Sequence, residues 1–339
     1  MRAESIVVKG TRFAYRHSTA TTSETVGTRE TVLLLHGLGG DHRGLAAVAS
    51  GLPSPAATSL PGLAAALPGP ASTGLPGLAT ALPGSAAVAT GLPGLDVIVP
   101  DLPGYGDSAP LTQPHTLAAY AAAIEAFREA LDLGPVHLIG HSLGASIALL
   151  HASTYPASLR SLTLINPVST ANNMTANLGK LYYRLAAALP ARAARFWLAS
   201  KPAVYIADAM IIVTKDKAIR RRILDEDYEN YARSSVPAMI ESFLSYYDTD
   251  FAQRAAQVTV DTLLITGDAD RIAPVASVTA LAAGIPSATL RVLPGAGHLV
   301  PMEAPADVLA PLVPFLRDRL IRTVPETVDD SVADPTESV

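Results

Sequence analysis

The sequence predicts an α/β protein whose mostly parallel sheet is covered by helices on both faces. Short apolar runs alternate with longer segments of helical character along most of the chain, and this alternation is typical of parallel sheets buried on both sides. The chain has 339 residues, of which 49% are hydrophobic and 16% are charged, so it can form a large core. We therefore expect one α/β domain with a smaller lid.

Eight short runs of residues are predicted to be strands. The first two are close together and are expected to form an antiparallel lead-in to the sheet. The predicted strands are 5–9, 12–16, 31–35, 96–99, 136–139, 161–165, 262–266 and 289–293. Helices are expected at 45–50, at 145–155 and at 116–131, where Thr116 can cap an alanine-rich run.

The segment Gly140-His141-Ser142-Leu143-Gly144 places a serine between a predicted strand and a predicted helix. A serine on a tight strand-to-helix turn presents its hydroxyl outward, beside the first amides of the helix. Glycines on both sides fit this turn, because it leaves no room for side chains where strand and helix meet. Ser142 is therefore the candidate nucleophile.

A serine nucleophile needs a base to take its proton, and the base needs a carboxylate to orient it. Suitable residues follow in glycine-containing loops after two later predicted strands, first Asp268 and Asp270 and then His298. His298 is the candidate base. Asp270 is preferred as the acid because it leaves enough loop to reach His298, and Asp268 remains the alternative.

The loop after the predicted strand 31–35 can supply part of an oxyanion hole. It reads His36-Gly37-Leu38-Gly39-Gly40, and the backbone N–H of Leu38 can form one half of the hole while that of Leu143 forms the other. We expect His36 to be a hydrogen-bonded structural residue. His141, beside the nucleophile, is either a substrate-pocket residue or a packing residue.

Together, the Ser142 segment and the loops that hold Asp270, His298 and residues 36–40 resemble those of the α/β-hydrolase fold family. The resemblance extends over roughly residues 5–322. Two further segments carry the resemblance, the loop Asp101-Leu102-Pro103-Gly104-Tyr105-Gly106-Asp107-Ser108 and the pair Gly297-His298 followed by Glu303 and Pro305. The resemblance implies a mostly parallel eight-stranded sheet flanked by helices, with a helical cap inserted after the sixth strand. The family's G-x-x-D pattern falls on Asp270. Ser142 argues against the family members that use an aspartate nucleophile, such as haloalkane dehalogenases and most epoxide hydrolases.

The predicted domain organisation has four parts. Residues 1–167 and 251–322 are expected to form the core, and residues 168–250 the cap, whose many aromatic side chains pack mostly among themselves, with Trp197 a candidate pocket residue. Residues 51–93 repeat Leu-Pro-Gly and are either a partner-binding flap or, as we favour, a low-complexity insertion without a fixed fold. Residues 323–339 are expected to be a disordered acidic tail.

The function that these features favour is a serine hydrolase that cleaves an ester of an apolar small molecule through an acyl-enzyme on Ser142. Three other activities use the same triad, and no residue separates them from ester hydrolysis: carbon–carbon bond hydrolysis of vinylogous diketones, cofactor-free perhydrolysis and acyl transfer. A small-molecule receptor on the same scaffold is the alternative from another class.

The composition argues against several other classes. A net charge of −5 gives no reason to expect nucleic-acid binding, and the absence of cysteine excludes disulfides and thiolate nucleophiles. No histidines and carboxylates have metal-ligand spacing, and no phosphate-binding glycine loop is present, so neither a metal nor a cofactor is expected. Since no signal peptide or transmembrane segment is found, we expect a cytoplasmic protein without stable membrane insertion. The oligomeric state is not predicted.

Overall fold

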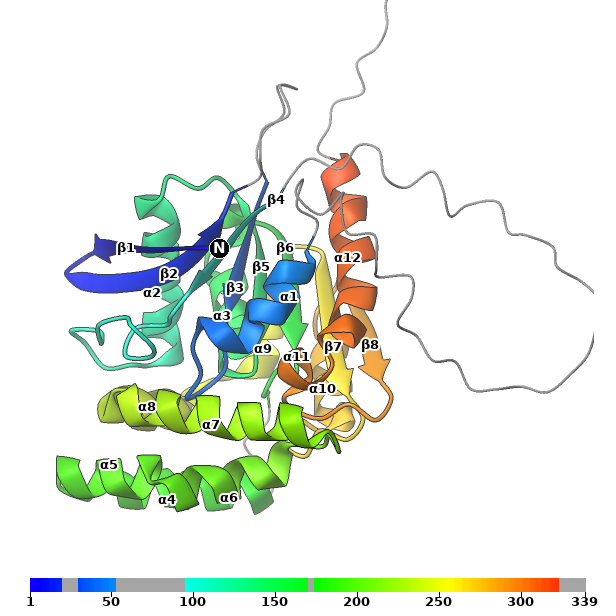
Figure 1. The fold of residues 1–339 in the computed structure, drawn as a ribbon. Helices are drawn as coiled ribbons and strands as arrows, with labels where there is room; N and C mark the ends of the chain where they lie inside the picture. Colours follow the sequence, from blue (N-terminus) through cyan, green and yellow to red (C-terminus); the bar gives the residue numbers. More distant parts are fainter. Residues whose placement is uncertain (20–29, 53–94, 170–173, 323–339) are drawn as a thin grey trace, which may run out of the picture.

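The computed structural model describes residues 1–19, 30–52, 95–169 and 174–322 of the chain. The predictions for the insertion beyond residue 52 and for the acidic tail, residues 323–339, lie outside the described residues. The described chain forms a sheet flanked by helices, with a further group of helices along one edge of the sheet (Figure 1).

One eight-stranded sheet forms the centre of the described molecule, in the order β1-β2-β4-β3-β5-β6-β7-β8. β1 and β2 form an antiparallel hairpin, β2 pairs antiparallel with β4, and the other neighbours are parallel. The predicted fold class is therefore confirmed. The strands are β1 (Arg2–Val8), β2 (Thr11–Ser18), β3 (Glu30–Leu35), β4 (Leu95–Pro100), β5 (Val136–His141), β6 (Leu159–Ile165), β7 (Thr262–Gly267) and β8 (Ala288–Leu293).

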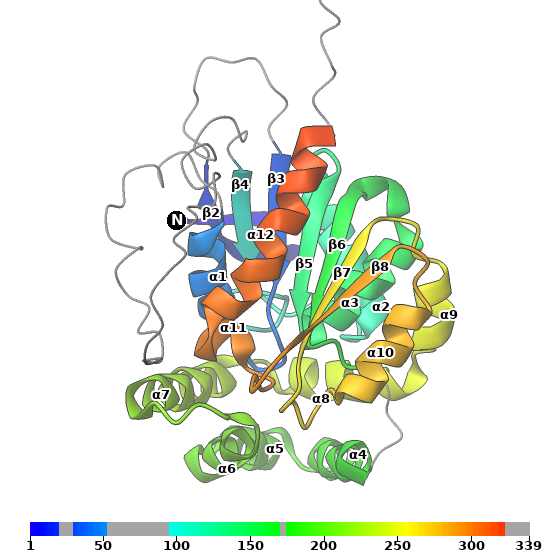
Figure 2. The same cartoon turned by 90° about the vertical axis from the view of Figure 1, so that its right-hand side faces the viewer.

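Side chains of the parallel strands alternate between two cores, one on each face of the sheet. Leu33 and Leu35 of β3 belong to the core that contains α2 (Leu117–Ala130) and α3 (Leu143–Thr154). Val32 and Leu34 belong to the core on the other face, with α1 (Ala46–Gly51) and α12 (Pro305–Arg322). In Figure 2, α1 and α12 lie in front of the sheet and α3 behind it. Burial on both faces explains why these strands are nearly continuous apolar runs.

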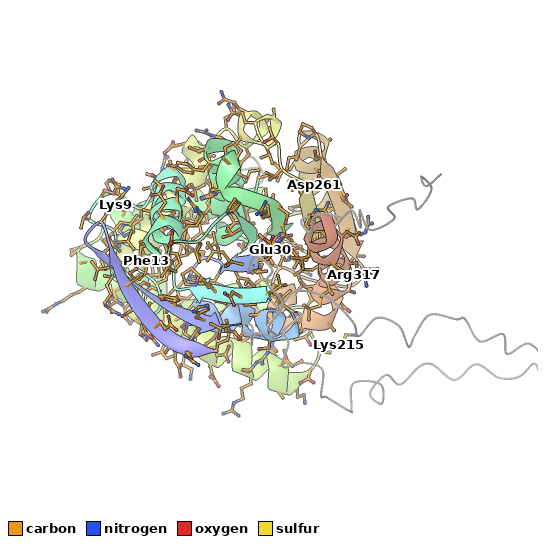
Figure 3. The ribbon with its side chains drawn as sticks, turned by 90° about the horizontal axis from the view of Figure 1, so that it is seen from above. Lys9, Phe13, Glu30, Lys215, Asp261 and Arg317 are labelled. Carbon is orange, nitrogen blue, oxygen red and sulfur yellow. The ribbon has the colours of Figure 1, made fainter. Side chains whose placement is uncertain are left out.

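The three helices that the sequence predicts in these layers, α1, α2 and α3, begin and end close to the predicted positions. Thr116 caps α2, because its side-chain oxygen accepts a hydrogen bond from the amide of Ala119 at 3.1 Å. Phe13 of β2, which is labelled in Figure 3, stacks on Phe127 of α2 with ring centroids 4.9 Å apart. The remaining elements of the core are η1 (His42–Leu45), η3 (Pro156–Ser158), α9 (Phe251–Ala256), α10 (Val275–Ala283) and α11 (Val300–Glu303).

A group of helices lies between β6 and β7 in the chain and covers the carboxyl edge of the sheet (Figures 1 and 2). We call them the inserted helices. α7 and α8 lie next to the core, and α4, α5 and α6 form an outer layer farther from the sheet. They are α4 (Met174–Ala187), α5 (Ala191–Ala199), α6 (Lys201–Ile211), α7 (Lys217–Arg233) and α8 (Val236–Ser245), followed by η4 (Tyr246–Asp248).

Two carboxyl groups interact between α6 and α7. Asp208 of α6 is only 3% exposed, and its Oδ2 has no hydrogen-bond partner among the described residues. Burial raises the pKa of Asp208 to about 7. Burial, together with the nearby charge of Asp208, raises the pKa of Asp227 on α7 well above its ordinary value. At neutral pH this pair therefore retains a proton.

We expect Asp208→Asn to raise the free energy of unfolding in alkaline solution. Asp208 keeps its proton in the folded state at pH values where the unfolded chain releases it. The free energy of unfolding of the wild-type protein therefore falls as the pH rises from about 4 to about 7. Above pH 7 the loss of stability stays at its full size. An amide cannot ionise, so at pH 8 the variant should be more stable by ~2 kcal/mol. Below about pH 4 both states of the wild-type protein are protonated, so this advantage should vanish.

Urea titrations of both proteins at pH 4, 6 and 8 measure this effect. Asp248→Asn, at an exposed position after the inserted helices, is the matched control and should show no such trend. A stability difference between Asp208→Asn and the wild type that is the same at all three pH values would contradict the prediction.

Candidate active site

The turn from β5 into α3 holds Ser142 in an unusual backbone conformation, with φ 50° and ψ −114°. Its glycines allow the chains to approach closely: a Cβ on Gly140 would overlap the carbonyl oxygen of Gly144, and a Cβ on Gly144 would overlap that of Leu35. A positive φ at a non-glycine residue costs free energy, and such residues are often found at functional sites. The local geometry therefore matches the predicted nucleophile turn.

Three predicted residues meet at the carboxyl edge of the sheet. Nε2 of His298 lies 2.8 Å from Oγ of Ser142, and Nδ1 of His298 lies 2.8 Å from Oδ2 of Asp270. All three residues are buried. An ionised carboxylate can only accept a hydrogen bond, so Nδ1 donates to Asp270 and Nε2 is left to accept the proton of the Ser142 hydroxyl. The arrangement can activate a serine for nucleophilic attack.

The two candidate acids have different partners in the structure. Oδ1 of Asp270 accepts the amide N–H groups of Ile272 and Ala273 at 2.7 and 2.9 Å, which leaves Oδ2 directed at His298. Asp268 is exposed, and its Oδ1 accepts the amide N–H of Gly295 at 2.6 Å. Asp268 thus closes the turn that precedes the histidine loop, while Asp270 contacts the histidine itself.

The loop that carries His298 is held through its backbone carbonyl groups. Asn166, which follows β6, donates from Nδ2 to the carbonyl oxygens of Gly297 at 2.9 Å and of His298 at 2.8 Å. Its Oδ1 accepts the amide N–H of Gly267, at the end of β7, at 3.1 Å. Asn166 is fully buried and has a positive φ of 45°. One side chain therefore joins three consecutive loops of the candidate site.

Asn166 was not among the predicted site residues. Asn-Pro after a strand is typical of a turn, and the partners of Asn166 lie more than 100 residues away in the sequence. The available signal was its place at the carboxyl end of a buried strand beside the strand that carries Ser142.

We expect Asn166→Ala to lower kcat of any reaction at Ser142 by about tenfold or more, with a smaller change in KM, because His298 would lose part of its support. The lost hydrogen bonds should also lower the free energy of unfolding by about 1–3 kcal/mol. Asn230→Ala removes another buried asparagine, which accepts a hydrogen bond from Arg43, and is the control for a general loss of stability. Equal losses of kcat in both variants would contradict a specific role.

The oxyanion loop, which we define as residues 36–40, lies directly beside the nucleophile turn. A Cβ placed on Gly37 would be 3.3 Å from Cβ of Ser142. The amide N–H groups of Leu38 and Leu143 donate no hydrogen bond to another described residue. Two unpaired amides, one in the oxyanion loop and one directly after Ser142, could bind a negatively charged oxygen.

His36 holds this loop in place. Its Nε2 accepts the amide N–H of Leu102 at 2.9 Å, so its Nδ1 donates to the carbonyl oxygen of Gly37 at 2.8 Å. Burial lowers the pKa of His36, and the ring therefore stays neutral in this bridging arrangement. The hydrogen bonds match the structural role that we predicted for His36.

Comparison with known proteins identifies the family of this chain. The sequence profile of the alpha/beta hydrolase fold matches residues 30–305. The chain belongs to the α/β-hydrolase fold family.

Individual relatives and structures agree with this α/β-hydrolase assignment. The chain is 29% identical to the dihydrolipoyllysine-residue acetyltransferase component of the acetoin cleaving system of Pseudomonas putida. The matched segment of 222 residues covers 64% of this chain and 55% of the relative. It thus spans about half the length of that relative. It is 27% identical to a 2-hydroxy-6-oxo-6-phenylhexa-2,4-dienoate hydrolase of Burkholderia cepacia, over 61% of this chain and 71% of that enzyme. A thermophilic esterase from Thermogutta terrifontis has the same fold, with a TM-score of 0.67, 21% identity, and coverage of 94% of this chain and 99% of the esterase.

The structure separates the two predicted pocket residues of this α/β-hydrolase. His141 is buried, and its Nε2 lies 2.8 Å from the carbonyl oxygen of His298, so it supports the histidine loop together with Asn166. Burial and the neighbouring His298 lower the pKa of His141 to about 3, and its ring is neutral. Trp197 lies on α5 in the outer layer, is 41% exposed and packs against Tyr182. A pocket role for either residue remains a prediction.

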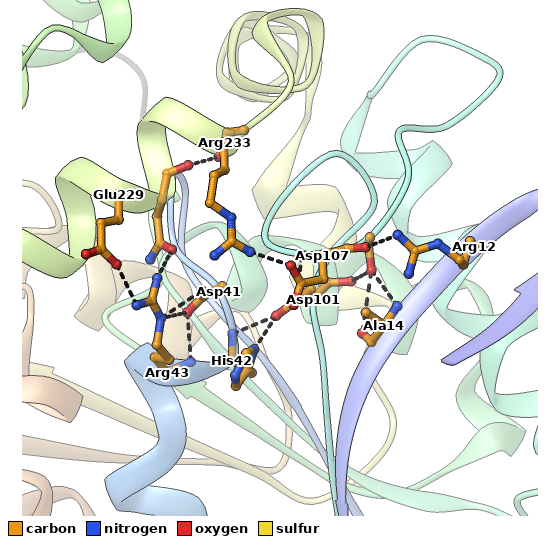
Figure 4. Close-up of polar contacts among 12 residues, drawn as sticks. Arg12, Ala14, Asp41, His42, Arg43, Asp101, Asp107, Glu229 and Arg233 are labelled. Atoms are coloured by element: carbon orange, nitrogen blue, oxygen red, sulfur yellow. Dashed lines mark hydrogen bonds and ion pairs between the residues drawn. The ribbon is translucent and has the colours of Figure 1, made fainter. Parts of the chain in front are cut away.

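Polar contacts fasten the inserted helices to the loops around the site (Figure 4). Arg43 pairs with Asp41 and reaches Glu229 at 3.0 Å on α7, and Arg233 of the same helix lies 2.6 Å from Asp107. On the other side of the site, the carboxylate of Glu303 accepts the amide N–H groups of Val213 and Thr214. Exposed ion pairs contribute little stability individually, and these contacts join α7 to the segments that follow β3 and β4.

The Asp101 loop supports the same region. Burial alone would raise the pKa of Asp101, but hydrogen bonds from His42 and the amide of Asp107 outweigh it and lower the pKa to about 2. A Cβ on Gly106, which has a φ of 53°, would overlap the Asp101 carboxylate. The ionised side chain of Asp101 therefore holds together its own loop and the segment around His42.

Two kinds of site are not found in the described part of the chain. No three histidine or carboxylate side chains of residues 1–19, 30–52, 95–169 and 174–322 come together as metal ligands. None of the helices in these ranges has the length and apolar character needed to span a bilayer.

Proposed function

We propose that the chain is a serine hydrolase that cleaves carboxylic esters of apolar small molecules through an acyl-enzyme on Ser142. The observation that supports this most directly is the unbroken hydrogen-bond chain from Asp270 through His298 to Ser142. The amides of Leu38, in the oxyanion loop, and of Leu143, directly after Ser142, are unpaired among the described residues. Nucleophile, base, orienting acid and oxyanion donors are the complete set of groups that acyl transfer requires.

In the proposed mechanism, Oγ of Ser142 attacks the ester carbonyl carbon while its proton passes to Nε2 of His298. The resulting oxyanion is held by the amides of Leu38 and Leu143, and Asp270 stabilises the charged imidazole. The carbon–oxygen bond then breaks, and the alcohol leaves with the proton of His298. A water molecule gives a proton to His298 and attacks the acyl group, and the acid leaves as Ser142 regains its proton.

The inserted helices belong to the segment that we propose to cover the bound substrate. We propose that residues 168–250 act as a cap on a core formed by residues 1–167 and 251–322. Tyr231 of α7 faces the oxyanion loop so closely that a Cβ on Gly39 would overlap its ring, and Tyr183 stacks on Phe243 at 4.1 Å behind it. These rings favour a substrate with an apolar acyl or alkyl part.

Labelling with a fluorophosphonate followed by a panel of p-nitrophenyl esters tests the proposal. We expect one labelled peptide, containing Ser142, and turnover that increases from acetate to longer apolar acyl chains before the pocket is filled. Labelling of a different serine, or no turnover of any ester despite labelling, would count against an esterase.

Carbon–carbon bond hydrolysis is the second candidate, because the 2-hydroxy-6-oxo-6-phenylhexa-2,4-dienoate hydrolase of Burkholderia cepacia is among the relatives of this chain. Incubation with a vinylogous 1,5-diketone of that class distinguishes the two activities, since cleavage removes the absorbance of the conjugated dienoate. A kcat/KM for the diketone above that for every ester would favour the second candidate.

A further inference from the structure

Most of the large apolar side chains that are exposed in the described molecule lie on one segment. Ten such side chains are at least 36% exposed, and seven of them fall between residues 178 and 206. Phe196 is the most exposed of all, at 76%. Single exposed apolar residues need no explanation, but a concentration of this kind marks an interaction surface.

Helical spacing places these side chains on the sides of the helices that face away from the sheet. Leu178, Leu181 and Leu185 follow one another at three and four residues, so they form one stripe along α4. The buried residues of the same helix, Tyr183 and Ala186, lie on the other side of it. The leucine stripe is therefore not part of the packing between the inserted helices.

The same argument holds for α5 and α6. Phe196 lies two residues from both Ala194 and Leu198, which are buried, and a separation of two residues corresponds to about 200° around a helix. Ile206 lies two residues from the buried Val204 and is 65% exposed. Because α4, α5 and α6 form the outer layer, the exposed residues make one outward surface, which we call the outer face (Figures 1 and 2).

The charges of this segment differ from those of the whole chain. The chain carries a net charge of −5, yet α4, α5 and α6 hold five basic residues and a single acidic one, Asp208. Asp208 is buried and does not contribute to the outer face. The basic residues are Lys180, Arg184, Arg192, Arg195 and Lys201. Three of them contact inner elements, since Arg195 donates to the carbonyl of Ala232 and the Lys180 and Lys201 ammonium groups lie over the rings of Tyr247 and Tyr228. Arg184 and Arg192 are exposed and supply positive charge beside the apolar side chains.

We propose that the outer face of α4, α5 and α6 docks on a lipid surface that carries anionic headgroups. Helices that combine leucine, phenylalanine and tryptophan with lysine and arginine lie in the headgroup region, where both kinds of side chain are satisfied. Two copies of the chain packed through this face would bring equal positive charges together, whereas an anionic lipid surface complements them. Docking is peripheral and needs no membrane-spanning helix.

Trp197 allows a direct test, because it is the single tryptophan of the chain and lies on the outer face. We expect its fluorescence to shift to shorter wavelength with vesicles of phosphatidylcholine mixed with phosphatidylglycerol, and not with phosphatidylcholine alone. Added salt should weaken the binding, because it screens the lysine and arginine charges. No shift with the anionic vesicles would overturn the proposal.

Two double variants distinguish vesicle binding through the outer face from non-specific binding by other exposed apolar side chains. The double variant Leu181→Ser/Phe196→Ser should bind the anionic vesicles at least about tenfold more weakly than the wild type. It lacks two of the apolar side chains that would be buried in the lipid surface. Val7→Ser/Val292→Ser removes two other exposed apolar side chains and should bind like the wild type. Circular dichroism checks that both variants are folded.

Two outcomes would contradict lipid docking. Equal vesicle binding by the Leu181→Ser/Phe196→Ser variant and the wild type would show that the outer face is not used. A dimer in light scattering without vesicles, lost in the same variant, would assign the face to a second copy of the chain. Neither readout depends on the proposed esterase activity, so failure of one proposal is distinguishable from failure of the other.

Discussion

Replacing Ser142 with alanine should abolish turnover of short p-nitrophenyl esters and all labelling by a fluorophosphonate. The alanine has no oxygen to attack a carbonyl or to bond phosphorus, and no other described serine contacts His298. In enzymes with this arrangement of groups, loss of one member lowers the rate by about 10⁴-fold or more. The expected change in kcat is therefore among the largest that a single substitution can produce in this protein.

The Ser142→Ala protein should remain folded, since it keeps the backbone of the nucleophile turn. The positive φ at this position strains serine and alanine alike, so the backbone gives no reason to expect a loss of stability. Ser146→Ala, one turn further along α3, is the matched control because this buried serine bonds to backbone carbonyls and not to His298. Residual turnover within tenfold of the wild type in Ser142→Ala would rule out the proposed nucleophile.

Asp270→Asn should lower kcat/KM far more than Asp268→Asn does, by about 10³–10⁴-fold against less than about tenfold. An amide at position 270 can present its NH₂ group to His298, which favours the tautomer with Nδ1 unprotonated and leaves Nε2 unable to accept the Ser142 proton. Asp268 bonds only to the amide of Gly295, so its amide variant changes a turn and leaves the histidine oriented.

Rates for both variants with the best ester of the panel measure this difference. Urea titrations of the same proteins show whether the loss of rate follows from a loss of stability. A larger loss in Asp268→Asn than in Asp270→Asn, at equal stability, would transfer the role of the acid to Asp268.

The residues of the candidate site were predictable because each follows a short apolar strand in a parallel sheet. The carboxyl ends of such strands meet at one edge, so Ser142, Asp270 and His298 could be placed together without knowledge of any contact. Strand limits were less predictable. β1 begins at Arg2 and not at residue 5, because its exposed first residues pair with the end of β2 regardless of their polarity.

Residues whose role depends on distant partners were not predictable. Asn166 belongs to the site only because its amide reaches the loops after β7 and β8. Asp208 is a polar residue in an alanine-rich helix, and its spacing of four from the buried Val204 is the one local sign that it faces inward. The outer face was also missed, because leucine and aromatic residues in helices are normally read as core.

The amino and carboxyl edges of the sheet differ in how much an attached domain would disturb the candidate site. Gly134 lies in the exposed connection between α2 and the start of β5, at the amino edge, and a Cβ placed on it would meet nothing within 4 Å. The side chains of Ser142, Asp270 and His298 lie at the opposite edge, one strand length or about 20 Å away. A reporter domain or an affinity tag inserted at Gly134 would therefore be held far from Ser142, which follows the other end of β5. This position offers an attachment point that leaves both the loops of the candidate site and the inserted helices unobstructed.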